Sequence, residues 1–262
     1  MSVSIALIYP DLLGTYGDGG NAAVLARRLL WRGIDAGVVS VTSSEPVPES
    51  CELYVIGGGE DLPQALAASK LAESKVLHRA TSAGAVVLAV CAGLQILGES
   101  FPGPAGKAVP GIGLLGCTTS ANEQARAVGE VLVQPAAQWQ DAGLTQPLTG
   151  FENHQAVTEL LPGTKPVGEV VVGVGNKDRT VEGAVTGRVW GTYLHGPVLA
   201  RNPQLADLLL GWAIGELPPL DPSRGMEPQA LHDERAHHGP VERRTAEADL
   251  LLGRRNRQAA RR

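Results

Sequence analysis

The sequence predicts an α/β fold built around a mostly parallel sheet. Over the first hundred residues, short apolar runs with β-strand character alternate with helical patterns, as they do in consecutive parallel β–α–β units. One apolar run, 85–90, leads directly into a cysteine and a small turn that contains glycine. This arrangement indicates a strand with a nucleophile at its carboxyl end. The 262 residues, 44% of them hydrophobic, are enough for one substantial core.

The elements of the amino-terminal part follow in chain order. Residues 5–9 are expected to form the first strand. Leucines at helical spacing predict a helix over 21–31, with Asn21 as its N-cap and Gly33 ending it before a strand around 36–41. The glycines that precede this helix do not follow the GxGxxG pattern, and no P-loop lysine follows them, so a nucleotide site is not expected there.

The second half of the chain changes character. A turn-rich crossing over 101–113 is followed by β-type segments near 129–134 and 170–174, which are expected to extend or cover the sheet. An amphipathic helix opened by Asn-Pro is predicted over 202–215 and is expected to pack beside the strand that ends at His195.

The carboxyl-terminal residues are rich in proline, arginine and glutamate. This composition predicts a polar, flexible tail over 218–262, after a single domain that spans 1–217. The arginine run near the end could contact anionic lipid or a partner, but a solvated tail is the simpler expectation.

Composition excludes several classes of function. The net charge is −5 and no basic patch with interleaved aromatic residues occurs, so nucleic acid is not an expected partner. Cys51, Cys91 and Cys117 are odd in number and widely spaced, which argues against a disulfide framework and a CxxC zinc site. The amino terminus has no leader pattern, and no apolar run reaches membrane-spanning length. We expect a cytoplasmic protein without a metal site.

Cys91 is the candidate nucleophile. The small residues Ala92 and Gly93 follow it directly, and they permit the sharp strand-to-helix turn that lifts a side chain out of a sheet. A helix that starts just after Cys91 would place the positive end of its dipole near the sulfur and favour the thiolate. A buried structural cysteine is the alternative interpretation, and the surrounding motifs argue against it.

Two further segments supply what such a thiolate needs. A strand over 52–56 runs into Gly57-Gly58-Gly59, whose missing side chains would let backbone N–H groups approach a ligand and form an oxyanion hole. Far downstream, 188–194 alternates like a strand and ends at His195. A cysteine and a histidine that each end a strand can meet at one sheet edge, an arrangement suited to nucleophilic catalysis.

These motifs resemble those of a known family. The sequences Gly-Gly-Gly at 57–59, Cys-Ala-Gly-Leu-Gln at 91–95 and Tyr-Leu-His-Gly at 193–196 resemble class I glutamine amidotransferases in order and spacing. Residues 9–21 and Gly-Phe-Glu-Asn-His at 150–154 resemble the branch that includes cobyric acid synthases and the glutaminase subunits of lipid II isoglutaminyl synthases. The resemblance covers roughly 3–215 and implies a three-layer fold with a mostly parallel central sheet and a nucleophile elbow.

The resemblance implies release of ammonia from L-glutamine. Cys91 would form a glutamyl thioester, and His195 would carry the proton to the departing ammonia and then activate water. Backbone N–H groups of Gly58 or Gly59 and of Ala92 would stabilise the oxyanion.

The resemblance also implies substrate-binding residues. Gln95, one turn beyond Cys91, would shape the glutamine pocket, and the guanidinium of Arg126 suits the substrate carboxylate. Asn153 and His154 would line the pocket or a partner contact. Ordinary surface roles for Gln95 and Arg126 remain open, and Gln155 replaces the glycine usual in the family.

One departure concerns the third catalytic residue. Many class I amidotransferases carry a glutamate two residues after the histidine, where this chain has Pro197. Cys91 and His195 would then act as a dyad, or an acidic residue from elsewhere would complete a triad. A carboxylate from a synthetase partner is the favoured source.

A synthetase partner is expected because the sequence has no Walker motif with which to activate an acceptor. By resemblance, the partner is a Mur-ligase-like subunit that forms a heterodimer with this chain, binds ATP and magnesium, and amidates the D-glutamate of lipid II to D-isoglutamine. No cofactor is expected in this chain, and the partner would bring it to the inner face of the membrane.

Three other interpretations are weighed. A cobyric acid-type amidotransferase would usually carry an ATP-using domain ahead of this one in the same chain. A non-catalytic regulatory module would not require Cys91 and His195. A cysteine peptidase or redox protein would not predict Gln95 together with the Gly-Phe-Glu-Asn-His segment at 150–154.

Overall fold

A parallel sheet carries the amino-terminal half of the fold. The computed structural model describes residues 2–15, 17–103, 107–122 and 126–220. Within them, a six-stranded sheet has the order β13-β14-β4-β3-β1-β2. All neighbouring pairs are parallel except β13 with β14. The strands are β1 (Ser2–Ile8), β2 (Asp35–Val41), β3 (Leu53–Ile56), β4 (Val86–Val90), β13 (Ala184–Thr186) and β14 (Val189–Thr192). The predicted mostly parallel α/β sheet is confirmed.

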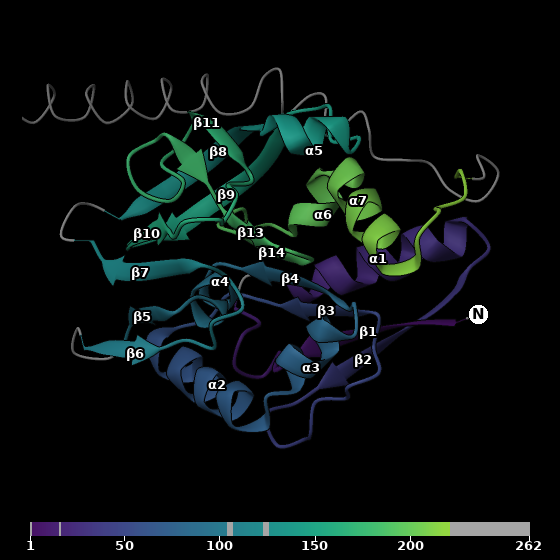
Figure 1. The fold of residues 1–262 in the computed structure, drawn as a ribbon, viewed down its shortest axis with the longest axis horizontal. Helices are drawn as coiled ribbons and strands as arrows, with labels where there is room; N and C mark the ends of the chain where they lie inside the picture. Colours follow the sequence, from purple (N-terminus) through teal and green to yellow (C-terminus); the bar gives the residue numbers. More distant parts are fainter. Residues whose placement is uncertain (1, 16, 104–106, 123–125, 221–262) are drawn as a thin grey trace, which may run out of the picture.

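Helices cover both faces of this sheet, with α2 and α3 on one side and α1, α6 and α7 on the other (Figure 1). Their bounds are α1 (Gly19–Trp31), α2 (Asp61–Ser74), α3 (Val76–Ser82), α4 (Ala92–Leu97), α5 (Ala137–Asp141), α6 (Val198–Arg201) and α7 (Pro203–Ile214). Every residue of β3, β4 and β14 is buried, because a strand between two helical layers has no solvent-facing side. The apolar runs of the sequence therefore become the central strands.

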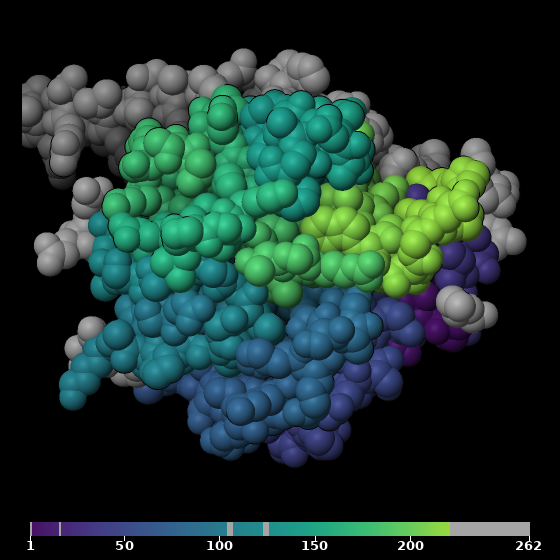
Figure 2. Space-filling view, viewed as in Figure 1, coloured from purple at the N-terminus to yellow at the C-terminus, as the bar shows by residue number. Residues whose placement is uncertain are grey.

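Two smaller sheets lie together at one end of the molecule, on the left in Figure 1. One has the order β10-β7-β5-β6 and the other β12-β11-β8-β9. Their strands are β5 (Ser100–Pro102), β6 (Ala108–Pro110), β7 (Cys117–Ala121), β8 (Ala127–Pro135), β9 (Leu148–His154), β10 (Ala156–Leu160), β11 (Gly168–Val172) and β12 (Val181–Glu182). In the space-filling view these teal and green segments pack directly against the blue amino-terminal half (Figure 2).

The predicted β-type segments near 129–134 and 170–174 pair with each other in β8 and β11. They form a sheet of their own and do not extend the six-stranded one, because their hydrogen bonds go to β9 and β12.

The first helix begins two residues earlier than predicted. Asp18, not Asn21, occupies the N-cap position. Asn21 is buried inside the helix, where its Oδ1 accepts the backbone N–H of Leu199 at 2.9 Å. The prediction of Asn21 as N-cap was therefore wrong, since its side chain serves a contact with α6. Gly33, with φ of 75°, ends this segment in the left-handed region as expected.

The helix predicted over 202–215 is α7, with Asn202 at its N-cap. Trp212 of this helix lies 6.0 Å from Trp190 of β14, measured between ring centroids. This contact places α7 beside the strand that precedes His195, as expected. Residues 221–262 of the predicted tail lie outside the described residues. None of the described helices is both long and apolar enough to span a membrane.

An ion pair joins α7 to α1 and supports a stability prediction. The Asp207 carboxylate receives Nε and Nη2 of Arg28 at 2.8 and 2.6 Å and Nη2 of Arg32 at 2.8 Å. The side chain of Arg28 is only 3% exposed. Asp207→Ala is expected to lower the free energy of unfolding by about 2–4 kcal/mol, because a buried cation loses its bidentate partner. Urea denaturation measures this, with the exposed Asp141 changed to Ala as control; equal losses in the two variants would contradict it.

Candidate active site

Cys91 lies at a strained turn between β4 and α4. Its φ and ψ are 52° and −105°, a combination that is rare for a residue with a side chain and is typical of a nucleophile elbow. The backbone N–H of Cys91 donates to the carbonyl of Thr192 at 2.8 Å. A Cβ at Gly93 would lie 2.8 Å from the carbonyl oxygen of Ile56, so glycine is required where α4 crosses β3. The predicted elbow is confirmed.

His195 follows β14 and is held by backbone pairing with Phe151. Its N–H donates to the Phe151 carbonyl at 2.8 Å, and the Phe151 N–H donates back at 3.2 Å. The imidazole is 2% exposed. Burial alone would lower the pKa of His195, but hydrogen bonds and negative charge from Asp18 and Cys91 outweigh it and raise the pKa to about 9. The structure therefore brings Cys91 and His195 together, as the sequence predicted.

Asp18 was not among the site residues predicted from the sequence. Its Oδ2 lies 3.7 Å from Nδ1 of His195, and the side chain is fully buried. This carboxylate comes from the loop after β1, whereas the favoured expectation was a partner subunit. A signal was present, since Asp18 follows the first predicted strand, and the carboxyl ends of parallel strands share one edge of a sheet.

The glycine loop after β3 supports this carboxylate. The N–H of Gly58 donates to Oδ2 of Asp18 at 2.8 Å. Gly58 or Gly59 was expected to donate to the oxyanion, and Gly59 is now the candidate because the N–H of Gly58 is directed to Asp18. A Cβ at Gly57 would lie 2.2 Å from the carbonyl oxygen of Leu13, so the loop can pack against the 10–15 segment only without side chains.

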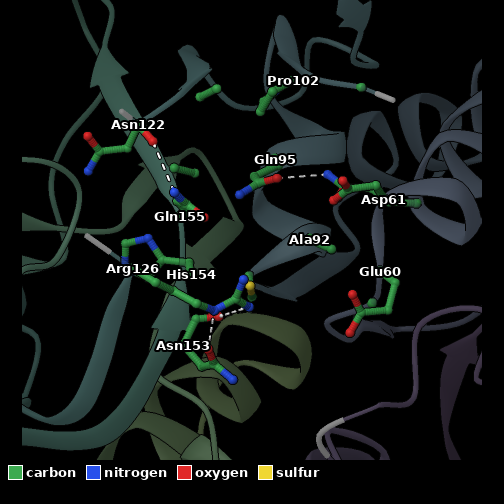
Figure 3. A pocket seen from close by; sticks show the side chains of 16 residues that line it. Glu60, Asp61, Ala92, Gln95, Pro102, Asn122, Arg126, Asn153, His154 and Gln155 are labelled. Atoms are coloured by element: carbon green, nitrogen blue, oxygen red, sulfur yellow. Dashed lines mark hydrogen bonds between the residues drawn. The ribbon is translucent and has the colours of Figure 1, made fainter. Parts of the chain in front are cut away.

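A cavity of about 380 Å³ opens over Cys91, within the size range of small-molecule sites. Figure 3 shows its walls, which come from the start of α2 and from α4 on one side and from the ends of β5, β7, β9 and β10, with Arg126, on the other. All the remaining predicted site residues except Gly58 line it: Gly59, Ala92, Gln95, Arg126, Asn153 and His154. The structure thus gathers them around the thiol.

Arg126 and Asn153 form one polar group on the cavity wall. Nε of Arg126 donates to Oδ1 of Asn153 at 2.6 Å, and Nη2 donates to the Asn153 carbonyl at 3.4 Å. Arg126 directly precedes β8, which pairs with the β9 strand that carries Asn153. Asn153 orients the guanidinium, which reaches toward the middle of the cavity (Figure 3), where it can meet a carboxylate.

Gln95 is 7% exposed and belongs to a buried chain of polar side chains. Its Oε1 accepts Nε2 of Gln64 at 2.8 Å, and its Nε2 donates to the Tyr193 hydroxyl at 3.2 Å. That hydroxyl lies 2.6 Å from Oγ1 of Thr158. Gln64 was not predicted, although its place one turn into the helix after the glycine loop marks it as a neighbour of the site.

His154 forms part of the cavity wall through stacking. Its ring lies 4.0 Å from the Tyr193 ring at an interplanar angle of 21°, and its Nε2 is 3.7 Å from Oε2 of Glu152. Gln155, which stands where the family has glycine, is not among the described residues with positive φ. Its Nε2 donates to the Asn122 carbonyl at 3.3 Å, so the substitution is accommodated without a left-handed backbone.

Comparison with known proteins agrees with this geometry. The chain matches the CobB/CobQ-like glutamine amidotransferase domain over residues 4–203. It is 34% identical over 215 residues to the lipid II isoglutaminyl synthase (glutamine-hydrolyzing) subunit GatD of Streptococcus pneumoniae, covering 81% of this chain and 80% of that protein. The Staphylococcus aureus GatD subunit is 34% identical over 203 residues, 76% of this chain and 79% of that protein.

A cobyric acid synthase from Pelotomaculum thermopropionicum is 39% identical over 150 residues, 52% of this chain but 27% of that protein. Among solved structures, PurLQS from Thermotoga maritima aligns with a TM-score of 0.56 at 18% identity, covering 81% of this chain and 99% of that one. A Thermotoga maritima glutamine amidotransferase aligns at 0.51 with 16% identity, covering 90% and 98%. These two similarities concern the fold.

The structural neighbours and the elbow give the fold class expected from the sequence motifs. The domain match extends over well more than half of the residues, and two relatives above 30% identity align with most of the chain. The chain belongs to the CobB/CobQ-like family of glutamine amidotransferases.

Proposed function

We propose that this chain hydrolyses L-glutamine and delivers the ammonia to a Mur-ligase-like synthetase that amidates the D-glutamate of lipid II. The observation that carries the chemistry is that His195 lies between Asp18 and Cys91, the residue of the three that lines the cavity. The similarity to GatD subunits over about four fifths of both chains supports lipid II as the acceptor of the ammonia.

The first half-reaction is acylation. The Cys91 thiolate attacks the side-chain amide carbon of glutamine, and the imidazolium of His195 gives its proton to the departing ammonia. Backbone N–H groups of Gly59 and Ala92 stabilise the oxyanion, each contributing about 3–4 kcal/mol. Asp18 keeps the imidazole oriented and stabilises its charged form.

The second half-reaction is hydrolysis of the glutamyl thioester. Neutral His195 accepts a proton from water, whose oxygen attacks the thioester carbon and releases glutamate with the thiolate. The net change is glutamine plus water to glutamate plus ammonia. The Arg126 guanidinium binds the α-carboxylate of glutamine at the opposite wall, while Gln95 and Asn153 shape the pocket between them.

The synthetase supplies the energy-consuming step. ATP and magnesium bind to that subunit, which activates the acceptor carboxylate, and this chain binds it as a heterodimer in the cytoplasm, near the inner face of the membrane. The comparisons favour this reading over a cobyric acid synthase, because this chain aligns with 80% of one GatD subunit and 27% of one cobyric acid synthase.

Ammonia release from L-glutamine by the purified chain tests the chemistry. The acceptor is tested by adding the Mur-ligase-like synthetase, ATP, magnesium and lipid II, and by mass spectrometry of the stem peptide. We expect ammonia release that depends on Cys91, and amidated lipid II only when both subunits are present. Ammonia release without lipid II amidation would shift the acceptor to the cobyric acid class. A folded chain that releases no ammonia with or without the partner would favour a regulatory module.

A further inference from the structure

The two residues between β14 and His195, Tyr193 and Leu194, leave the regular sheet, and side chains accept their backbone N–H groups. The N–H of Tyr193 donates to Oε1 of Glu182 at 2.6 Å, and the N–H of Leu194 donates to Oγ1 of Thr192 at 3.1 Å. The N–H of His195 returns to a backbone acceptor at Phe151. Because buried N–H groups need acceptors, the path of this segment depends on the Glu182 and Thr192 side chains.

Glu182 and Thr192 are also bonded to each other. The hydroxyl of Thr192 donates to Oε1 of Glu182 at 2.9 Å while its oxygen accepts from Leu194, so the two side chains form one continuous clamp on the backbone. Both are fully buried. A buried carboxylate that receives a backbone N–H and a hydroxyl is a rigid anchor, since water cannot replace either bond.

Hydrogen bonds to the adjacent backbone fix the position of Glu182. Asn176 exchanges two hydrogen bonds with the next residue, Gly183: its Nδ2 donates to the Gly183 carbonyl at 2.9 Å and its Oδ1 accepts the Gly183 N–H at 2.7 Å. A Cβ at Gly183 would lie 2.6 Å from the carbonyl oxygen of Gly191. This close approach brings β12 against the end of β14, which is where the carboxylate is needed.

The same clamp reaches the nucleophile. The carbonyl oxygen of Thr192 accepts the backbone N–H of Cys91 at 2.8 Å. Thr192 is therefore bonded to the Cys91 backbone through its carbonyl and to the segment that carries His195 through its hydroxyl. A shift of Thr192 would change the separation between thiol and imidazole directly.

We propose that Glu182 and Thr192 are positioning residues that hold the imidazole of His195 against Cys91 and Asp18. This inference rests on the proposed glutamine hydrolysis. Neither residue lines the cavity over Cys91, so they act through the backbone and not through the substrate.

The clamp does not require a charged carboxylate. Burial raises the pKa of Glu182 to about 7, and the negative charge of Glu152 adds to this effect. The hydrogen bonds from Tyr193 and Thr192 lower the pKa but do not cancel the rise. Oε1 accepts both hydrogen bonds whether or not Oε2 carries a proton. Glutamine retains such an oxygen and leucine does not, which separates an acceptor role from a charge role.

The test compares Thr192→Val, Glu182→Leu and Glu182→Gln with wild type. Iodoacetamide alkylation of Cys91, followed by peptide mass spectrometry without glutamine present, reports the reactivity of the sulfur beside the His195 imidazole. At pH 6.5 we expect Thr192→Val and Glu182→Leu to be alkylated about 10–100-fold more slowly, the penalty typical of a misplaced catalytic group. At pH 9.5 their rates should approach wild type, and Glu182→Gln should remain within about threefold at both values.

Glutaminase kinetics give the second readout. Thr192→Val and Glu182→Leu should lose kcat by about 10–100-fold while KM changes less than about threefold, because substrate contacts are untouched. Val133→Ala, at a fully buried position in β8, is the control for general destabilisation. It should change neither kcat nor the alkylation ratio, which is the alkylation rate of Cys91 at pH 6.5 divided by that at pH 9.5. Urea denaturation compares its loss of stability with that of the Glu182 and Thr192 variants.

Several results would overturn the proposal. One is a Thr192→Val variant with the wild-type alkylation ratio and kcat, and another is a Glu182→Gln variant as impaired as Glu182→Leu. Should Glu182→Leu fail to fold, Thr192→Val and Glu182→Gln still decide the outcome. If wild type shows rapid alkylation of Cys91 at pH 6.5 that the clamp variants lose, but no ammonia release, the positioning role stands and the proposed function fails.

Discussion

His195→Asn is expected to lower kcat for glutamine hydrolysis by about 10⁴–10⁶-fold, as loss of the general base does in other covalent-catalysis sites. Without the imidazole, the site loses the group that gives a proton to ammonia and takes one from water. The measurement is ammonia release at pH 7.5. His78→Asn is the matched control, because His78 lies on α3, is hydrogen-bonded to the Ile112 carbonyl and does not line the cavity over Cys91. A His195→Asn variant within tenfold of the control would contradict the role.

The pKa of His195 sets the pH dependence of the wild-type protein. The imidazolium persists below a pKa of about 9, and acylation needs that proton for the departing ammonia. The rate of acylation should therefore hold through neutral pH and fall as the pH rises through about 9. A fall near pH 6.5, the ordinary value for histidine, would show that Asp18 and Cys91 do not stabilise the imidazolium.

Asp18→Asn is expected to lower kcat by about 10²–10⁴-fold, the range seen when a histidine loses its orienting carboxylate. The amide oxygen can still accept the N–H of Gly58, so the glycine loop should keep its position. The negative charge beside Nδ1 is lost, however, and burial then lowers the pKa of His195. The descending limb of the pH profile should move below its wild-type position near pH 9.

The control for this substitution is Asp35→Asn, which removes the same charge from the exposed start of β2. Ammonia release is measured from pH 5.5 to 10 for both variants, without any synthetase. If the isolated Asp18→Asn chain is as active as the control and its pH limb is unmoved, the orienting carboxylate is not Asp18. A partner carboxylate would then return as the source.

Much of the catalytic centre could be predicted from local patterns. The apolar runs before Cys91 and His195 end at those residues, and parallel strands place their carboxyl ends at one edge. The small residues after Cys91 predicted its strained turn, whose φ of 52° the structure shows. Local pattern was sufficient here because each motif acts within one strand and the turn that follows it.

Other site residues depend on contacts between distant segments. Asp18 reaches His195 because β1 lies in the same parallel sheet as β14, three places away with β3 and β4 between them, and local periodicity does not determine strand order. Gly58 or Gly59 was expected to donate to the oxyanion, but the N–H of Gly58 donates to the Asp18 carboxylate instead. Asn21 was expected to cap a helix and instead bonds Leu199, 178 residues away.

The sequence by itself determined the strand-borne nucleophile and base, the glycine loop and the family, because these reside in contiguous motifs of fixed spacing. Only the tertiary structure decided which carboxylate faces His195 and which side chains hold its backbone. Asp18 and Glu182 are separated from His195 by 177 and 13 residues along the chain. Their roles arise because burial favours hydrogen bonds between polar groups that lie close in space at the sheet edge.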